Sequence, residues 1–467
     1  MKHFKRQLAL TLVLILVLTE TLNAQDLANE VADLQQILIE MKNDYENRIT
    51  ELEKRLDRAE RSVQRANKDV DQAMEIAEEA AISATAGVSS PNIYNPAIGA
   101  VLVARYANID SGNSGFSLGE SEINMKASVD SRFFGNLTMA LEDEGGETEV
   151  AVEEAWIQTI GLSNGLTLLG GRYFSGVGYL NKFHRHADDF GDRPLPYQEF
   201  LGGQYTPDGL QLRWIAPTSL LLEFGTELNW GNNFPSTGQS TTSPDAWTFF
   251  ANVGGDIGVS HSWQLGLLYL SANGTAQCSM DTRCNPILGE EGFGVINATA
   301  PGGMGKFNGD SNISGLDFVW KWAPDGNSTI QNFKFQGEYF SRNIKGYFNP
   351  VMPGAFSSGF DLTPYEPSFR NDDQDGWYLQ GIWQFQQGWR IGYRHDKVNL
   401  NNGLSFQLHR TCACINPTRD SFMIDWSPSE FSRLRMQFIN DRVRNESDSQ
   451  FLLQYIMSIG AHGSHEF

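Results

Sequence analysis

The sequence predicts an all-β transmembrane barrel of about 16 antiparallel strands, preceded by a signal peptide and an α-helical coiled-coil stalk. From Ile98 on, segments of about ten residues alternate apolar with polar side chains, as lipid-facing and lumen-facing positions do in such barrels. The chain ends "FLLQYIMSIGAHGSHEF", an alternating strand whose free edge is protected if it pairs with the first strand. A soluble sandwich would bury the apolar face instead, but the export signal described next favours the membrane barrel.

Residues 1–24 read as a cleaved signal peptide. Lys2, Lys5 and Arg6 precede the apolar run "LALTLVLILVL", and a small-residue cleavage site ends at Ala24. A single-pass anchor is the alternative, but the run is shorter than the roughly twenty residues that cross a bilayer. The segment therefore predicts export, and the barrel pattern predicts the bacterial outer membrane.

Residues 25–86 have the pattern of a periplasmic coiled coil. Apolar residues from Leu27 to Ala80 recur in alternating steps of three and four, which is a coiled-coil seam. One long solvated helix is the alternative, although the apolar stripe is narrow for it. The stalk argues for an oligomer, and we expect a homotrimer. Gly87 and two prolines then end the helix, which leaves 87–97 as a linker and 98–467 as the barrel.

The alternation of the barrel strands is clearest in four segments, at 122–129, 220–227, 333–339 and 389–396. Three strands end on similar phrases, "RWIAPTS", "KWAPDGN" and "DWSPSEF", each a tryptophan at an expected membrane interface before a proline turn. These short turns should be periplasmic and the longer connections should face outward. We assign 403–409 to a loop, because a strand there would reverse the direction of the last strand.

The connection from Phe174 to Asp208, between the fifth and sixth predicted strands, is far longer than a turn requires. Its aromatic residues need cover, which only the barrel interior offers, so we expect it to fold inward and narrow the pore. The expected constriction sets loop acids against lumen-facing arginines: Asp188, Asp189, Asp192 and Glu199 against Arg213, Arg390, Arg394, Arg433 and Arg435. Such groups can select small solutes by size and charge, and can also pair as salt bridges that pin the loop to the wall.

Two histidine pairs are candidate metal ligands. His184 and His186 in "HRH" lie near Asp188 and Asp189, and imidazoles suit zinc, copper and nickel. Solvated or hydrogen-bonded histidines are the alternative. The second pair stands in the tail "AHGSHEF" and consists of His462 and His465. In the expected topology the two pairs lie on opposite sides of the membrane, so they form separate sites. No other cofactor is expected.

The four cysteines would be exported to an oxidising compartment. Their close spacing favours a disulfide between Cys278 and Cys284, while pairing of Cys412 with Cys414 stays open. A metal site on "CAC" is disfavoured, since no histidine or further cysteine stands at ligand spacing.

Composition and motifs exclude two function classes. The formal net charge is −21, which argues against a nucleic-acid partner. The sequence has no H-E-x-x-H motif, and lumen and loops account for its many carboxylates, so no enzyme is expected.

The segments "NPAIGAVL", "GRYFSGVGYLNKFHRH", "SPSEFSRLR" and "SIGAHGSHEF" resemble a family of proteobacterial outer-membrane proteins with a periplasmic coiled coil. Members carry the label of zinc-regulated or TonB-dependent outer-membrane receptors, which implies a role in metal uptake under zinc limitation. TonB-dependent transporters have 22-stranded plugged barrels, for which this chain is too short, so trimeric porins are the better architectural analogue.

Together these features predict a porin-like channel in outer-membrane lipid for passive uptake of small polar or ionic solutes. The resemblance adds a link to zinc or other metal ions. A receptor for a metal complex and a structural outer-membrane tether built on the stalk are the alternatives.

Overall fold

The computed structural model divides into two units, Met1–Ile93 and Tyr94–Phe467. It describes residues 96–110, 114–144, 147–230, 234–236, 243–277, 305–350, 368–400, 416–443 and 447–460, and five isolated helical positions in the first unit. The predicted signal peptide, nearly all of the predicted stalk and linker, the loop at 403–409, the four cysteines, and His462 and His465 lie outside these residues. Within the described part of the chain, no helix is both long and apolar enough to cross a membrane.

The second unit is an antiparallel sheet joined by short helical segments in its connections. Its strands are β1 (Ala97–Ile109), β2 (Gly115–Leu118), β3 (Ser121–Ser128), β4 (Phe133–Glu144), β5 (Glu147–Thr159), β6 (Leu166–Arg172), β7 (Asp208–Ile215), β8 (Leu221–Trp230), β9 (Ala246–Ile257), β10 (His261–Gln277), β11 (Gly305–Trp322), β12 (Asn332–Pro350), β13 (Ser368–Gln386), β14 (Trp389–Asn399), β15 (Thr418–Ser429), β16 (Ser432–Asp441) and β17 (Asp448–Gly460). The short helices are η1 (Ser163–Gly165), η2 (Leu180–Lys182), η3 (Arg185–Ala187), α2 (Leu195–Leu201) and η5 (Pro324–Gly326).

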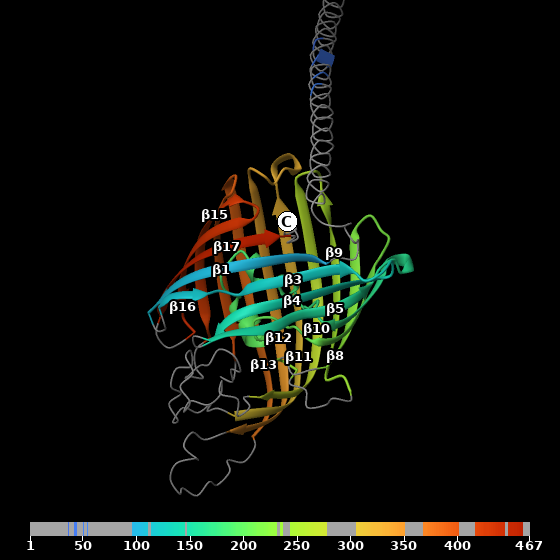
Figure 1. The fold of residues 1–467 in the computed structure, drawn as a ribbon, viewed down its shortest axis with the longest axis vertical. Coiled ribbons are helices and arrows are strands. Elements are labelled where there is room, and N and C mark those ends of the chain that lie inside the picture. The colour runs from blue at the N-terminus through green and yellow to red at the C-terminus, as the bar shows by residue number, and fades with distance from the viewer. Residues whose placement is uncertain are drawn as a thin grey trace, which may run out of the picture. The chain divides into compact units, whose positions relative to one another are not determined.

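The sheet closes on itself through its first and last strands. β1 pairs with β17 from Gly99 to Ile109, with Ala104 opposite Tyr455, and the strands from β3 on pair with their neighbours in the chain (Figure 1). β2 and β3 both pair with β1 and are two halves of one barrel strand, so the 17 labelled strands form a 16-stranded barrel. Both the strand number and the pairing of the terminal strand were predicted from the sequence, and both predictions are confirmed.

A β-bulge separates β2 from β3. Ala104 pairs with Leu118 but Val101 pairs with Glu122, so β2–β3 has one more residue than β1 between these pairs. The extra residue reverses which side chains face inward. Phe116 in β2 is exposed on the outside, whereas Glu122, also at an even position, is buried on the inside. The bulge thus aims a carboxylate into the barrel, a common use of bulges near functional sites.

The predicted alternation of inward and outward side chains is present in the described strands. On β12, Tyr339 is exposed on the outside while Glu338 is buried inside, and on β14 Tyr393 and Arg394 differ in the same way. An apolar outer face and a polar inner face are the arrangement of transmembrane β-barrels. The three Trp-Pro phrases lie at short connections, between β7 and β8, β11 and β12, and β15 and β16, as the sequence indicated.

Candidate functional site

The connection between β6 and β7, residues 173–207, lies inside the barrel and is called the lumen loop here. Its side chains form a hydrophobic core with inward residues of the wall, and α2 packs on β13 and β14. The loop contributes Val177, Leu180, Leu195, Tyr197, Phe200, Leu201 and Tyr205, and the wall contributes Leu268, Leu270, Ile313, Phe340, Tyr378 and Val398 among others. The expectation that this segment folds inward because its aromatic residues need cover agrees with this packing.

Two buried wall carboxylates anchor the lumen loop, and the sequence analysis named neither as a site residue. Glu338 accepts hydrogen bonds from the backbone N–H groups of Tyr179 and Leu180, both 3.0 Å away, and from the hydroxyls of Tyr197 (2.9 Å) and Tyr378 (2.6 Å). A carboxylate taken out of water needs such donors, because an unsatisfied buried charge is costly. Three of these donors belong to the loop and fix it to β12, whereas the fourth, Tyr378, belongs to β13 of the wall.

Glu227 on β8 holds the segment just before these residues. It accepts hydrogen bonds from the Ser175 hydroxyl (2.6 Å), the Gly176 backbone N–H (2.8 Å) and the Gln211 amide (2.9 Å). Alternation places both Glu227 and Glu338 inward, but sequence spacing carries no signal that either meets the loop. The loop is thus anchored on two separated parts of the wall.

Asp192 occupies the centre of the charged contacts between loop and wall. Its Oδ2 lies 2.7 Å from Arg394 and 2.8 Å from Arg419, and its Oδ1 accepts a hydrogen bond from the Gln437 amide (2.5 Å). Burial alone would raise the pKa of Asp192, but Arg394 and Arg419 hold it below its ordinary value. The Arg394 guanidinium also stacks over the Phe190 ring, 4.7 Å from its centroid. Asp192 is therefore ionised at neutral pH.

Asp189 pairs with a second set of wall bases. It contacts Lys334 and lies 3.0 Å from Arg390, which also binds Asp425 on β15. Burial would raise the pKa of Asp189, but the charges of Lys334 and Arg390 lower it below its ordinary value. Of the predicted opposing groups, Arg390 and Arg394 therefore do meet loop acids.

Asp188, Arg433 and Arg435, also predicted for the constriction, do not form acid–base pairs between loop and wall in the contacts that the structure describes. Asp188 pairs with Arg193 within the loop, 2.8 Å away, and its backbone carbonyl accepts hydrogen bonds from Arg433 and Arg435. Burial raises the pKa of the Asp188 carboxyl to about 7, against the lowering effect of Arg193.

Two further predicted residues lie away from these contacts. Glu199 in α2 pairs with Arg342 on β12, 2.8 Å away. Arg213 takes no part in the loop contacts that the structure describes: its ionic partner is Glu223 on the next strand, at 3.7 Å. Arg342, Arg419 and Lys334 were missed in the sequence, although their alternation with outward neighbours could have placed them inside.

The histidines of "HRH" lie next to glutamates of the wall, not next to the expected aspartates. Nδ1 of His184 is 3.0 Å from Glu122 and 3.3 Å from Glu153, and its Nε2 is 3.2 Å from Glu154. Nδ1 of His186 is 2.8 Å from Glu122. Asp188 and Asp189, which lie close to the histidines in the sequence, pair with bases instead, as described above. Burial would lower the pKa of His184, but its hydrogen bonds to the three glutamates raise it well above the ordinary value.

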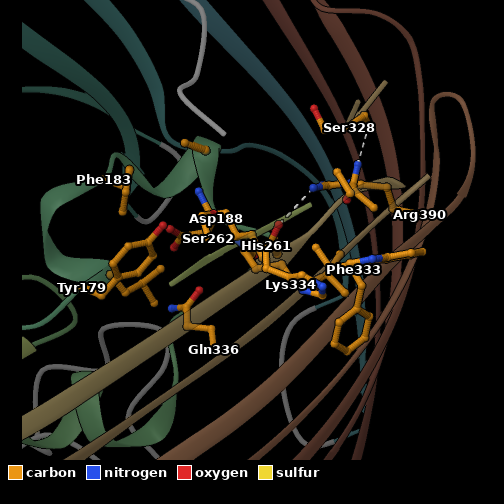
Figure 2. A pocket seen from close by; sticks show the side chains of 18 of the residues that line it. Tyr179, Phe183, Asp188, His261, Ser262, Ser328, Phe333, Lys334, Gln336 and Arg390 are labelled. Carbon is orange, nitrogen blue, oxygen red and sulfur yellow. Dashed lines mark hydrogen bonds and ion pairs between the residues drawn. The ribbon is translucent and has the colours of Figure 1, made fainter. Parts of the chain in front are cut away.

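A cavity of about 900 Å³ lies between the lumen loop and the short turns that follow β9 and β11. Figure 2 shows Tyr179, Phe183 and Asp188 of the loop on one side of it and Lys334 and Arg390 of the wall on another. Charged groups of both signs line it, five acids and five lysines or arginines: Glu122, Asp188, Asp189, Asp256 and Asp325, and Lys126, Lys321, Lys334, Arg390 and Arg433. The space suits small polar or ionic solutes.

Comparisons with known proteins give one sequence relative and several barrels of similar fold. No family model matches the chain. An uncharacterized protein of Aquifex aeolicus (strain VF5) is 29% identical over 374 residues, which cover 76% of this chain and 70% of that protein.

Three solved outer-membrane barrels illustrate the structural likeness. A loop L8 deletion mutant of OmpT, an outer membrane protein of Vibrio cholerae, has a TM-score of 0.49 at 11% identity and covers 79% of this chain and 100% of its own. Salmonella typhi OmpF has a TM-score of 0.46 at 12% identity, with 79% and 99% covered. The anion-selective porin from Comamonas acidovorans has a TM-score of 0.44 at 9% identity, with 78% and 99% covered.

Proposed function

We propose that the protein is a porin-like outer-membrane channel for the passive uptake of small polar or ionic solutes, narrowed by the lumen loop. The observation that carries this proposal is a closed 16-stranded barrel whose interior holds an anchored loop beside a charged cavity of about 900 Å³. A tether would need neither a charged lumen nor a loop fixed inside it. The apolar outer face fits a barrel surrounded by outer-membrane lipid.

Passage of solutes accounts for the lumen better than catalysis does. Asp189 and Asp192 are committed to ion pairs with Arg390 and Arg394, and Glu338 is committed to four hydrogen-bond donors. Fixed charges of opposite sign at a narrow point orient water and discriminate among solutes by size and charge. The proposal therefore includes no enzymatic activity.

The proposal also covers the transported solute and the oligomeric state. The resemblance favours zinc or other metal ions, free or as a complex, among the solutes that pass. The predicted stalk at 25–86 favours a homotrimer with the stalk in the periplasm, and a tether to the periplasm could coexist with a pore.

Planar-bilayer recording of the purified full-length protein tests the channel. Stepwise increases in current as single molecules insert are the expected result. A folded barrel that inserts into liposomes, remains resistant to protease and yet gives no current would contradict conduction and favour the tether. Uptake of radiolabelled zinc, compared between a deletion strain and its complemented parent under zinc limitation, tests the cargo.

A further inference from the structure

Two histidines of the lumen loop meet glutamates of the wall at the edge of the cavity. Nδ1 of His184 and Nδ1 of His186 both contact the carboxylate of Glu122 on β3, and ligand atoms of these three residues all lie within 4.8 Å of one another. We propose that Glu122, His184 and His186 bind a divalent transition-metal ion of the zinc class inside the lumen. This site goes beyond the proposed channel, because metal binding does not depend on conduction.

The distances between the donor atoms are close to those of a metal site. Bonds of 2.0–2.1 Å in a tetrahedral zinc site place neighbouring ligand atoms about 3.3 Å apart. The nitrogen-to-oxygen distances here are 2.8 Å for His186–Glu122, 3.0 Å for His184–Glu122 and 3.3 Å for His184–Glu153. An ion can therefore replace the protons that now join these atoms, with small shifts of the side chains.

The donor set selects the class of metal. Two imidazoles with carboxylates suit zinc, cobalt, nickel and copper, whereas calcium and magnesium prefer oxygen ligands alone. Glu153 lies on the Nδ1 side of His184 and can serve as a fourth ligand, whereas Glu154 contacts Nε2 and can orient the imidazole. Four glutamates face the site, and of these Glu120 pairs with Arg185, 3.2 Å away. The acidic surroundings favour a cation.

Two β-bulges direct Glu122 and Glu153 toward the lumen loop, so strand pairing positions these glutamates. The bulge between β2 and β3 aims Glu122 inward, as described above. A second bulge on β5, where Thr138 pairs with Glu154 and Met139 with Val152, adds Glu153 as an extra residue. Glu153 and Glu154 thereby both reach His184. Two such bulges, on barrel strands separated by β4, converge on one histidine pair and help to build a rigid site.

The histidines are also held in place, and the cavity reaches the site at Glu122 and His184. The rings of His184 and His186 stack with centroids 5.5 Å apart, and the rings of His184 and Phe174 form a T-shaped pair with centroids 4.8 Å apart. Glu122 and His184 line the cavity, so an ion that enters the lumen can load directly. A bound ion would tie the lumen loop to β3 and β5. In the strand order of the closed barrel these strands lie roughly opposite β12, where Glu338 anchors the loop.

Metal titration of the full-length protein in detergent, after treatment with chelator, tests the proposal. Co²⁺ is followed by visible absorption and Zn²⁺ by calorimetry. We expect one ion per chain at this site, with the intense cobalt absorption of a four-coordinate site that contains imidazole. The double variant His184→Asn/His186→Asn should weaken binding at least about 100-fold, because it removes two of the ligands.

Two control variants separate this site from other histidines. His395→Asn removes a histidine that pairs with Asp420 at 2.7 Å, away from the cluster, and should leave binding unchanged. His462→Asn/His465→Asn removes the tail pair and should also leave the cobalt spectrum unchanged. Loss of the spectrum in the tail variant, with full binding in the His184/His186 variant, would overturn the proposal, and so would a wild-type protein that binds neither metal.

A conservative variant guards against a folding defect in the double variant. Glu122→Gln has the same shape and can still contact the imidazoles, but it is a poor metal ligand, so we expect binding to weaken about 10- to 100-fold. Unchanged affinity in Glu122→Gln would contradict the assigned ligand set. The heat-dependent shift in electrophoretic mobility reports whether each barrel is folded. Bilayer conductance of the same preparations shows whether the channel persists when metal binding is lost.

Discussion

The hydroxyl of Tyr197 in α2 donates a hydrogen bond to the carboxylate of Glu338 on β12, 2.9 Å away, and both side chains are completely or almost completely buried inside the barrel. A carboxyl acceptor of the wall and a donor from the middle of the lumen loop thus meet inside the barrel. Because Glu338 holds four donors at once, its removal should release the loop more than the loss of any single donor would.

Glu338→Ala should therefore raise the mean single-channel conductance and its fluctuations. The variant leaves two backbone N–H groups and two tyrosine hydroxyls without their acceptor, at a cost of about 1–3 kcal/mol for each that stays unsatisfied. Glu223→Ala is the matched control, since Glu223 is an inward acid that pairs with Arg213 and not with the loop. Equal conductance in the two variants would show that the Glu338 contacts do not position the loop.

Excision of 184–197, with a short Gly-Ser bridge in its place, should also raise the conductance. These residues include both histidines, the three aspartates of the charged contacts and the start of α2, so much of the material that fills the lumen is removed. Recording in planar bilayers provides the measurement. An unchanged conductance would place the conducting path away from the loop.

Asp192→Asn should destabilise the docked loop by about 3 kcal/mol, because it leaves the buried guanidinium groups of Arg394 and Arg419 without their shared anion. In limited proteolysis at increasing denaturant, the loop of the variant should become cleavable at a lower denaturant concentration than the loop of the wild type. Asp420→Asn, which alters an ion pair outside the lumen, is the control. Equal protection in both variants would mean that the ion pairs contribute little.

The ion pairs of Asp189 and Asp192 also define a pH window. The pKa of each is lower in the folded protein than the ordinary value of about 3.9, so their stabilisation is complete above that value and is lost as the pH falls through the lowered pKa. Between pH 7 and pH 5 these two pairs should hold the loop without change. A conductance titration checks this, and the Asp192→Asn variant shows which part of any change at lower pH belongs to Asp192.

We expect weak cation selectivity that fades as the salt concentration rises. The cavity lining has equal numbers of acids and of lysines or arginines, so it should favour neither sign strongly. The acidic sequence "EDEGGETE", which spans the end of β4 and the start of β5, can concentrate cations only within a Debye length, about 8 Å at physiological salt. Reversal potentials across a salt gradient provide the measurement. Strong anion selectivity at low salt would instead indicate that the arginines dominate the path.

Removal of 25–86 should leave a folded barrel but weaken its association. The expectation depends on the apolar seam of the sequence, which gains stability only when helices pair. Light scattering in mild detergent gives the molar mass of each form. An oligomer of undiminished stability without the stalk would show that the barrel walls assemble it.

The fold was predictable because its signals are local. The Trp-Pro turns mark strand ends, and alternation along each strand indicates which side chains face lipid. The alternation holds for Tyr339 and Glu338, and for Tyr393 and Arg394. The inward folding of the lumen loop followed from the simple need to bury its aromatic residues.

The partners inside the lumen were not predictable to the same extent. Asp192 meets Arg394 and Arg419, and Tyr197 meets Glu338, across separations that leave no trace in local spacing. The histidine pair was found from its spacing, but its glutamates were not, because each bulge shifts the inward parity by one residue. Glu153 would face outward in an unbroken alternation from Glu154, and only the register of β4 with β5 shows otherwise.

The order of contacts along the chain has a consequence for biogenesis. The lumen loop is synthesised before every strand from β9 to β14 on which its core packs, and the β1–β17 seam joins the first strand to the last. The loop cannot acquire its partners until most of the wall has been made, and the wall cannot close until the final strand arrives. Closure of the seam then encloses the loop, so the pore is narrowed no later than the barrel closes.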